Sequence, residues 1–248
     1  KTAPSREKIE ELIVRPNAIY IFGSFTVTDR NGRDITHLFS SRLRLVFVYV
    51  LLHSTHNGVL SASLNEVFWP DKPDDKVKNL KGVTINQIRK NLTELDGVDK
   101  GYFRLVFTDC YCDYFRFRML KNAEEVENEL GILLMRGKFL EGMDAGMMDH
   151  FKQKVEEFLA SFLPLEIERL YQQHKYDAVI RFCNVLFRVD PVSELALAYC
   201  IHALHHIGST QEAIMQYSLF VREYKQMMNE DYSTSYADLM SKNPPFHR

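Results

Sequence analysis

The chain has 248 residues, of which 46% are hydrophobic and 26% charged, and its formal net charge is −2. These proportions are typical of folded globular proteins and exclude a disordered, collagen-like or low-complexity chain. The longest apolar run, residues 45–52, is far shorter than the roughly 20 residues that a membrane-spanning helix needs, so we expect no membrane contact within this segment.

Cysteine usage and the first residues bear on location. The four cysteines match neither a zinc-ligand pattern nor the dense pairing of small secreted proteins, which favours a cytoplasmic protein. The sequence shows no signal-peptide pattern. Because the chain begins with Lys1, we expect residues 1–17 to be a linker or the end of an upstream segment of a longer protein.

Charge is distributed unevenly along the chain. Residues 1–120 contain 18 Lys and Arg against 14 Asp and Glu, whereas residues 121–248 contain 13 against 19. A mildly basic first half joined to an acidic second half predicts two domains with different partners. The segment 76–90 contains five Lys and Arg and no acid. On charge alone, this segment fits a nucleic-acid contact or a solvated helix face.

The first predicted elements are short strands and a helix. Apolar residues alternate through residues 18–28, which predicts a strand interrupted at Gly23. A turn is expected at residues 29–33, with a returning strand at 34–36. A helix then begins at Ser40 or Ser41 and stops near Asn57-Gly58.

Two further helices are predicted. A short helix begins at Ser61 or Ser63 and ends at Trp69-Pro70, and a longer one spans about residues 76–95. The expected buried stripe of the longer helix is Leu80, Thr84, Ile85, Ile88, Leu92 and Leu95. Gly82 lies in the middle of this helix, where glycine costs about 1 kcal/mol relative to alanine. Close approach of another surface would explain it.

The remaining sequence predicts a hairpin and then helices only. Residues 102–107 and 111–117 are expected to pair as a β-hairpin across residues 108–110. From Lys121 onward the apolar residues follow a helical period. Residues 175–180 and 210–215 are similar segments 35 residues apart. A period near 34 residues is typical of tetratricopeptide (TPR) repeats, so we expect a helical repeat domain.

Several stretches carry a resemblance to known families. Residues 18–118 resemble an OmpR/PhoB-type winged-helix DNA-binding domain, through Phe22-Gly-Ser-Phe25, Leu64-Asn-Glu-Val-Phe-Trp-Pro70 and Val83-Thr-Ile-Asn-Gln-Ile-Arg-Lys-Asn-Leu92. Residues 121–241 resemble the bacterial transcriptional activator domain, through the stretches 133–140 and 217–224. This order is that of a SARP-type bacterial transcriptional regulator. It implies an α+β N-terminal winged helix-turn-helix at 18–118, followed by an all-α TPR-like helical repeat domain at 121–248.

The resemblance implies a sequence-specific DNA-binding transcriptional regulator. Its partners would be double-stranded DNA and either RNA polymerase or a second copy of the chain. The helix at 76–95 would enter the major groove, where each base pair displays a distinct hydrogen-bonding pattern. Three residues would face base edges: Gly82, Val83 and Gln87. Nine residues would face phosphates: Lys78, Lys81, Thr84, Asn86, Arg89, Lys90, Arg42, Arg44 and Arg104.

Other classes of function have weaker support in the sequence. It contains no phosphate-binding glycine loop, no Gly-x-Ser-x-Gly and no nucleophile beside a paired His, so we expect no enzymatic activity and no cofactor. His202 and His206 have one metal-ligand spacing but lack a third ligand, so we expect no metal. The alternative is a protein–protein interaction scaffold built on the TPR-like repeats, without DNA binding. Retention of duplex DNA would distinguish the two.

Overall fold

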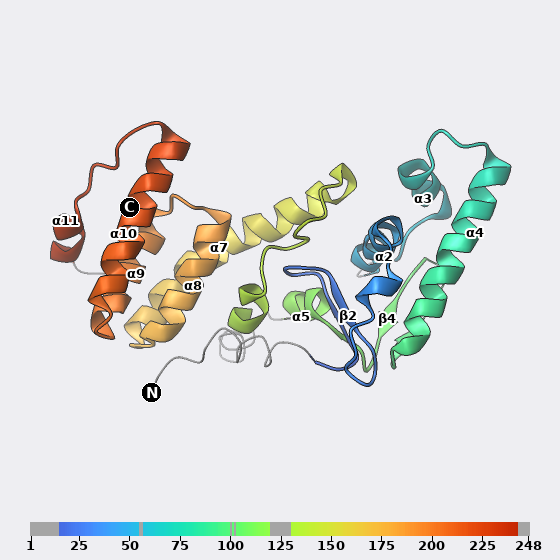
Figure 1. Ribbon diagram of the computed structural model, residues 1–248, viewed down its shortest axis with the longest axis horizontal. Coiled ribbons are helices and arrows are strands. Elements are labelled where there is room, and N and C mark those ends of the chain that lie inside the picture. Colours follow the sequence, from blue (N-terminus) through green and yellow to red (C-terminus); the bar gives the residue numbers. More distant parts are fainter. Residues whose placement is uncertain (1–14, 55–56, 100, 102, 120–129, 243–248) are drawn as a thin grey trace. The chain divides into compact units, whose positions relative to one another are not determined.

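The computed structural model describes residues 15–54, 57–99, 101, 103–119 and 130–242. The chain divides into two compact units (Figure 1). The first comprises residues 1–123 and 136–152, and the second comprises residues 124–135 and 153–248. Most of the expected linker at 1–17, and the expected junction at 121–125, lie outside the described residues.

A small three-stranded sheet opens the first unit. Its central strand β1 (Ala18–Tyr20) is antiparallel to β2 (Thr26–Thr28) and parallel to β5 (Tyr111–Cys112). The predicted interruption at Gly23 is the reversal between β1 and β2, where φ is +72°. A Cβ atom at this position would lie 2.4 Å from the carbonyl oxygen of Arg136, so both the backbone conformation and the close approach require glycine.

Three α-helices follow. The short η1 (Thr36–Leu38) leads into α2 (Ser41–His53), which is followed by α3 (Ser61–Phe68) and α4 (Asp74–Asn91). All residues from 46 to 52 are buried, so this part of α2 is enclosed on every side and belongs to the core of this unit. The three predicted helices are confirmed, although α2 ends at His53, before Asn57. The predicted returning strand at 34–36 is reduced to a single bridge.

The predicted hairpin between residues 102–107 and 111–117 is wrong. A short η2 (Leu92–Glu94) follows α4, and β3 (Val98–Asp99) then pairs with β4 (Val106–Phe107). Residues 113–119 form a helix, α5 (Asp113–Met119). The alternating Phe and Arg of this segment suggested a strand. Tyr114 and Phe117, however, are buried on one helical face, and the Phe117 ring lies 5.1 Å from that of Phe22.

Residues 136–152 complete the first unit. Phe139 forms an antiparallel bridge with Phe22, and their ring centroids are 5.0 Å apart. The Leu140 N–H donates to the Ile21 carbonyl at 2.8 Å. This segment, which contains η3 (Gly146–Met148), therefore continues the sheet of the first unit, although its sequence pattern is that of the second half.

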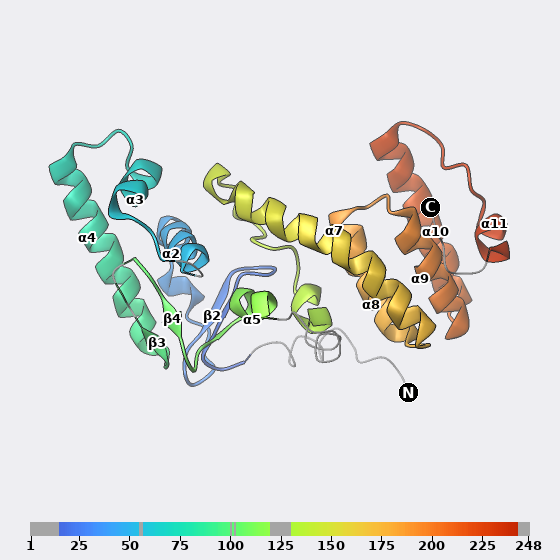
Figure 2. The same ribbon diagram turned by 180° about the vertical axis from the view of Figure 1, so that it is seen from behind.

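Among the described residues of the second unit, helices joined by loops are the only regular secondary structure (Figure 2). Its helices are α7 (Asp149–Gln172, whose first four residues are grouped with the first unit), α8 (Tyr176–Val189), α9 (Glu194–His206), α10 (Thr210–Met228) and α11 (Tyr236–Ser241). Helix α9 packs against both α8 and α10. Ala178 and Ala213, which mark the predicted repeat, are both buried near the start of α8 and of α10. Among the described residues, no helix combines the length and hydropathy needed to cross a bilayer.

Candidate nucleic-acid interface

Helix α4 has a buried face and an exposed face. Val77, Ile85 and Ile88 are buried, whereas Val83 is 70% exposed on the opposite side. Leu80 was predicted in the buried stripe, but it is 43% exposed. At about 100° per residue, Ile88 and Ile85 lie about 20° and 80° around the helix from Val77, whereas Leu80 lies about 60° on the other side of Val77, at the edge of the buried face.

The exposed face of α4 carries amides, a branched apolar side chain and basic residues. The exposed amides are those of Asn79, Asn86 and Gln87. No acidic residue follows Asp75 within the helix. Gly82 is exposed, and no described atom lies within 4 Å of the position that a Cβ would take there. The packing of the described residues therefore does not account for this glycine.

The first half of α4 is held to α3 by Lys81. Its ammonium group donates to the Ser61 hydroxyl at 2.5 Å and to the Asn65 side-chain oxygen at 2.8 Å. The same group lies 5.7 Å from the centroid of the Phe103 ring. Lys81, expected to face a phosphate, thus contacts α3 and the segment before β4.

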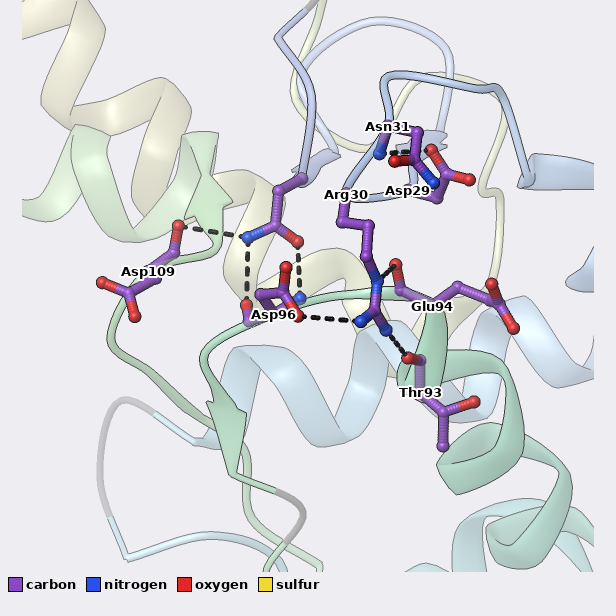
Figure 3. Close-up of polar contacts among 8 residues, drawn as sticks. Asp29, Arg30, Asn31, Thr93, Glu94, Asp96 and Asp109 are labelled. Carbon is purple, nitrogen blue, oxygen red and sulfur yellow. Dashed lines mark hydrogen bonds and ion pairs between the residues drawn. The ribbon is translucent and has the colours of Figure 1, made fainter.

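The C-terminal end of α4 is joined to the turn after β2 (Figure 3). The Arg30 backbone N–H donates to the Glu94 carbonyl at 3.1 Å, and its guanidinium donates to the Thr93 carbonyl. Arg30 also forms an ion pair with Asp96 at 3.2 Å. The Asp29 carboxylate closes the turn by accepting backbone N–H groups, which lower its pKa. Helix α4 is therefore fixed to the unit near its middle, through Lys81, and through η2, which follows its last residue.

Gln87 belongs to a chain of hydrogen bonds that leads into the core. Its side-chain Nε2 donates to Asn91 Oδ1 at 2.9 Å, and Asn91 Nδ2 donates to the Leu38 carbonyl at 2.7 Å. Asn91 is only 3% exposed. Asn91 was not among the predicted site residues, because a polar residue four positions after Gln87 on a largely buried face gave only a weak signal.

The other residues expected to face phosphates lie in different surroundings. Lys78, Asn86, Lys90 and Arg104 are exposed. The Thr84 hydroxyl donates to the Leu80 carbonyl within α4 at 2.8 Å. Arg89 is half-buried and lies about 120° around α4 from Val83.

Two of the expected phosphate ligands are on α2. The Arg42 guanidinium donates to the Phe68 carbonyl at 2.6 Å, and its centre lies 5.6 Å from the centroid of the Trp69 ring. Arg44 is half-buried, with its guanidinium 4.9 Å from the centroid of the Phe25 ring. Five of the expected α4 residues therefore share one exposed surface (Gly82, Val83, Asn86, Gln87 and Lys90), whereas these two arginines lie against aromatic rings of the unit.

The histidines and cysteines are occupied in packing. His202 is buried and bonds the Leu239 carbonyl at 3.1 Å, and burial lowers its pKa. His206 instead bonds the Tyr171 hydroxyl at 3.1 Å. The four cysteines are free and buried, and burial raises the pKa of Cys110 to about 12. Among the described residues, no cluster of His, Cys, Asp and Glu could hold a metal ion.

Comparisons with known proteins bear on both halves. Residues 118–240 match the family model of the bacterial transcriptional activator domain, which confirms the resemblance of the second half to that domain. The chain has no match among curated proteins. Among solved structures it is similar to Mycobacterium tuberculosis EmbR in complex with a low-affinity phosphopeptide, with a TM-score of 0.55 and 18% identity. The similarity covers 91% of this chain and 63% of that one. It is a similarity of fold, to a chain that is considerably longer than this one.

Proposed function

We propose that the chain is a sequence-specific, DNA-binding transcriptional regulator in which α4 enters the major groove of double-stranded DNA. The exposed face of α4 carries the proposal, because amides and Val83 lie there among lysines, without an acid after Asp75. Amide groups suit base edges and lysines suit phosphates. The transcriptional activator domain matched at residues 118–240 supports this reading.

Within this proposal Gly82, Val83 and Gln87 face base edges. Lys78, Asn86 and Lys90 face phosphates, and their exposure supports that role. The hairpin of β3 and β4, which follows α4 and η2, would be the wing, with Arg104 in the connection between its strands. The other five expected phosphate ligands would reach phosphates only by giving up or extending their present contacts. These are Thr84, Lys81, Arg89, Arg42 and Arg44.

The test is selection of bound duplexes from a random pool by the full chain, followed by titration of the selected duplex at several salt concentrations. If four to six basic side chains meet phosphates, log K should fall against log salt with a slope of about −3.5 to −5.5. A random duplex of the same length serves as the control. Binding that does not respond to salt, or the absence of any enriched sequence, would contradict the proposal.

For the second unit we propose protein interaction, with RNA polymerase or with a second copy of the chain. Exposed apolar side chains on α10 support this role: Ile214, Met215, Leu219, Met227 and Met228. A scaffold that binds proteins but not DNA is the second candidate function. Sedimentation of the full chain, alone and with a duplex, separates the two, because only the regulator should sediment with DNA.

A further inference from the structure

We infer that Asn91 is a positioning residue that holds the Gln87 amide in one orientation, and that this orientation makes Gln87 select adenine over guanine. The inference rests on the proposed function, because it assigns the class of base pair read by α4. It draws on the hydrogen-bond chain that connects Gln87, Asn91 and Leu38.

The orientation of each side-chain amide is set by the hydrogen-bonding group next to it on the side of the core. The Leu38 carbonyl can only accept a hydrogen bond, so the NH₂ group of Asn91 must face it. The Oδ1 atom of Asn91 then points toward Gln87 and can only accept. The NH₂ group of Gln87 must therefore face Asn91. Because Asn91 is buried, little water is available to compete for these positions.

The fixed amide leaves Gln87 with one free N–H and an acceptor oxygen. Adenine presents an acceptor, N7, beside a donor, the N6 amino group, in the major groove. The free N–H and the Oε1 of Gln87 match this pair. Guanine presents two adjacent acceptors, N7 and O6. An unconstrained glutamine could direct both of its N–H groups at guanine, but one of those of Gln87 is already donated to Asn91.

The surroundings of Gln87 favour the same base pair. Val83 lies one helical turn earlier on the exposed face and is 70% exposed. Its methyl groups suit contact with the C5-methyl group of thymine. Arginine is the residue that most commonly reads guanine, and the one arginine in α4, Arg89, is half-buried and lies about 160° around the helix from Gln87. An A·T pair is therefore the expected partner of Gln87.

The test compares full-chain variants on the duplex selected by the unaltered chain and on duplexes in which single A·T pairs are replaced by G·C. Asn91→Ala should lower the adenine preference at one position about tenfold. Gln87→Ala should lower the preference at the same position. The double variant should lose no more preference than Gln87→Ala alone, since Asn91 acts through Gln87.

A second variant separates orientation from folding. The carboxyl group of Asn91→Asp still presents an acceptor oxygen to Gln87, so this variant should keep the adenine preference even where its overall affinity or stability is lower. Equal loss of preference in Asn91→Ala and Asn91→Asp would overturn the inference. Weakening of the A·T and G·C duplexes by the same factor in Asn91→Ala would also overturn it.

Failure of the proposed function has a different signature. If the unaltered chain binds no duplex, the proposed function fails, and this inference fails with it. If the unaltered chain binds duplex with an adenine preference that Asn91→Ala leaves intact, only the positioning role of Asn91 is overturned. The NMR resonances of the Gln87 side-chain amide test the positioning by Asn91 in the absence of DNA. Asn91→Ala should move their chemical shifts to those of a solvated glutamine, and unchanged chemical shifts would count against the hydrogen bond from Gln87 to Asn91.

Discussion

The carboxylate of Asp113, the first residue of α5, accepts the backbone N–H of Ile21 with both of its oxygens, at 3.0 and 2.9 Å. This contact joins residues 92 positions apart and fixes α5 against the end of β1. The carboxylate also accepts the Phe22 N–H at 2.9 Å. Burial is the largest influence on Asp113 and raises its pKa to about 7, against the opposing effect of these N–H donors.

The first prediction concerns pH. Because the pKa of Asp113 is higher in the folded chain than the usual value near 4, the folded state keeps a proton that the unfolded state releases. The free energy of unfolding should therefore fall between about pH 4 and pH 7, by at most about 1.4 kcal/mol per pH unit from this group. Urea unfolding of Asp113→Asn should show a flatter pH dependence. The exposed Asp109→Asn is the control, and equal slopes for both variants would contradict the prediction.

The second prediction concerns the boundary of the first unit. A fragment of residues 15–152 should resist urea better than one of residues 15–123, because only the longer one supplies Phe139 and Leu140 to the sheet. The single tryptophan, Trp69, is buried in this unit and reports its unfolding by fluorescence. Equal midpoints for the two fragments would show that residues 136–152 add nothing to its stability.

The third prediction compares two glycines. Gly23→Ala should destabilise the first unit by more than about 1 kcal/mol, because of its positive φ and the nearby Arg136 carbonyl. Gly82→Ala should stabilise it by about 0.5–1 kcal/mol, since alanine suits a helix and meets no described atom there. If Gly82 faces DNA, the same variant should also bind the selected duplex less tightly. A more stable variant with unchanged affinity would remove Gly82 from the interface.

The fourth prediction separates a structural lysine from an exposed one. Lys81→Met should lower the free energy of unfolding by about 1 kcal/mol, because Ser61 and Asn65 lose their donor. Lys78→Met, at an exposed position of the same helix, should leave stability unchanged. Urea titration followed by Trp69 fluorescence measures both. A larger loss in Lys78→Met than in Lys81→Met would refute the role assigned to Lys81.

The fifth prediction separates specificity from affinity. Gln87→Ala should cost about 1–3 kcal/mol on the selected duplex and little on a random one. Lys90→Ala should weaken both duplexes similarly and reduce the salt slope by about one, because a lysine meets a phosphate as a point charge. Competition binding measures both, with circular dichroism to show that each variant is folded. If Gln87→Ala weakens both duplexes equally, another part of the exposed face, such as Asn79 and Asn86, lies against the bases.

The helices and the basic segment could be predicted from the sequence because they depend on neighbouring residues. Helices α3 and α4 follow from local apolar spacing, and the repeat was predicted from similar segments around Ala178 and Ala213, which are both buried. The same local reasoning failed at residues 113–119. The alternation of Phe and Arg there fits a strand, whereas the spacing of the buried Tyr114 and Phe117, three positions apart, fits a helix. It also misplaced Leu80, which lies at the edge of the buried stripe, where burial depends on whether another element of the folded unit covers it.

Contacts between distant residues were decided by the tertiary structure alone. Asn91 and Leu38 are 53 positions apart, and Asp113 and Ile21 are 92 positions apart, so no local pattern predicts either hydrogen bond. The pairing of Phe139 with Phe22 is of the same kind. The sequence by itself determined the helices whose apolar spacing is local, such as α3 and α4, and the basic, acid-free character of the segment after Asp75 in α4. The partners of buried polar groups depend on how the elements pack, because each buried donor and acceptor must find its partner wherever the folded chain brings one within reach.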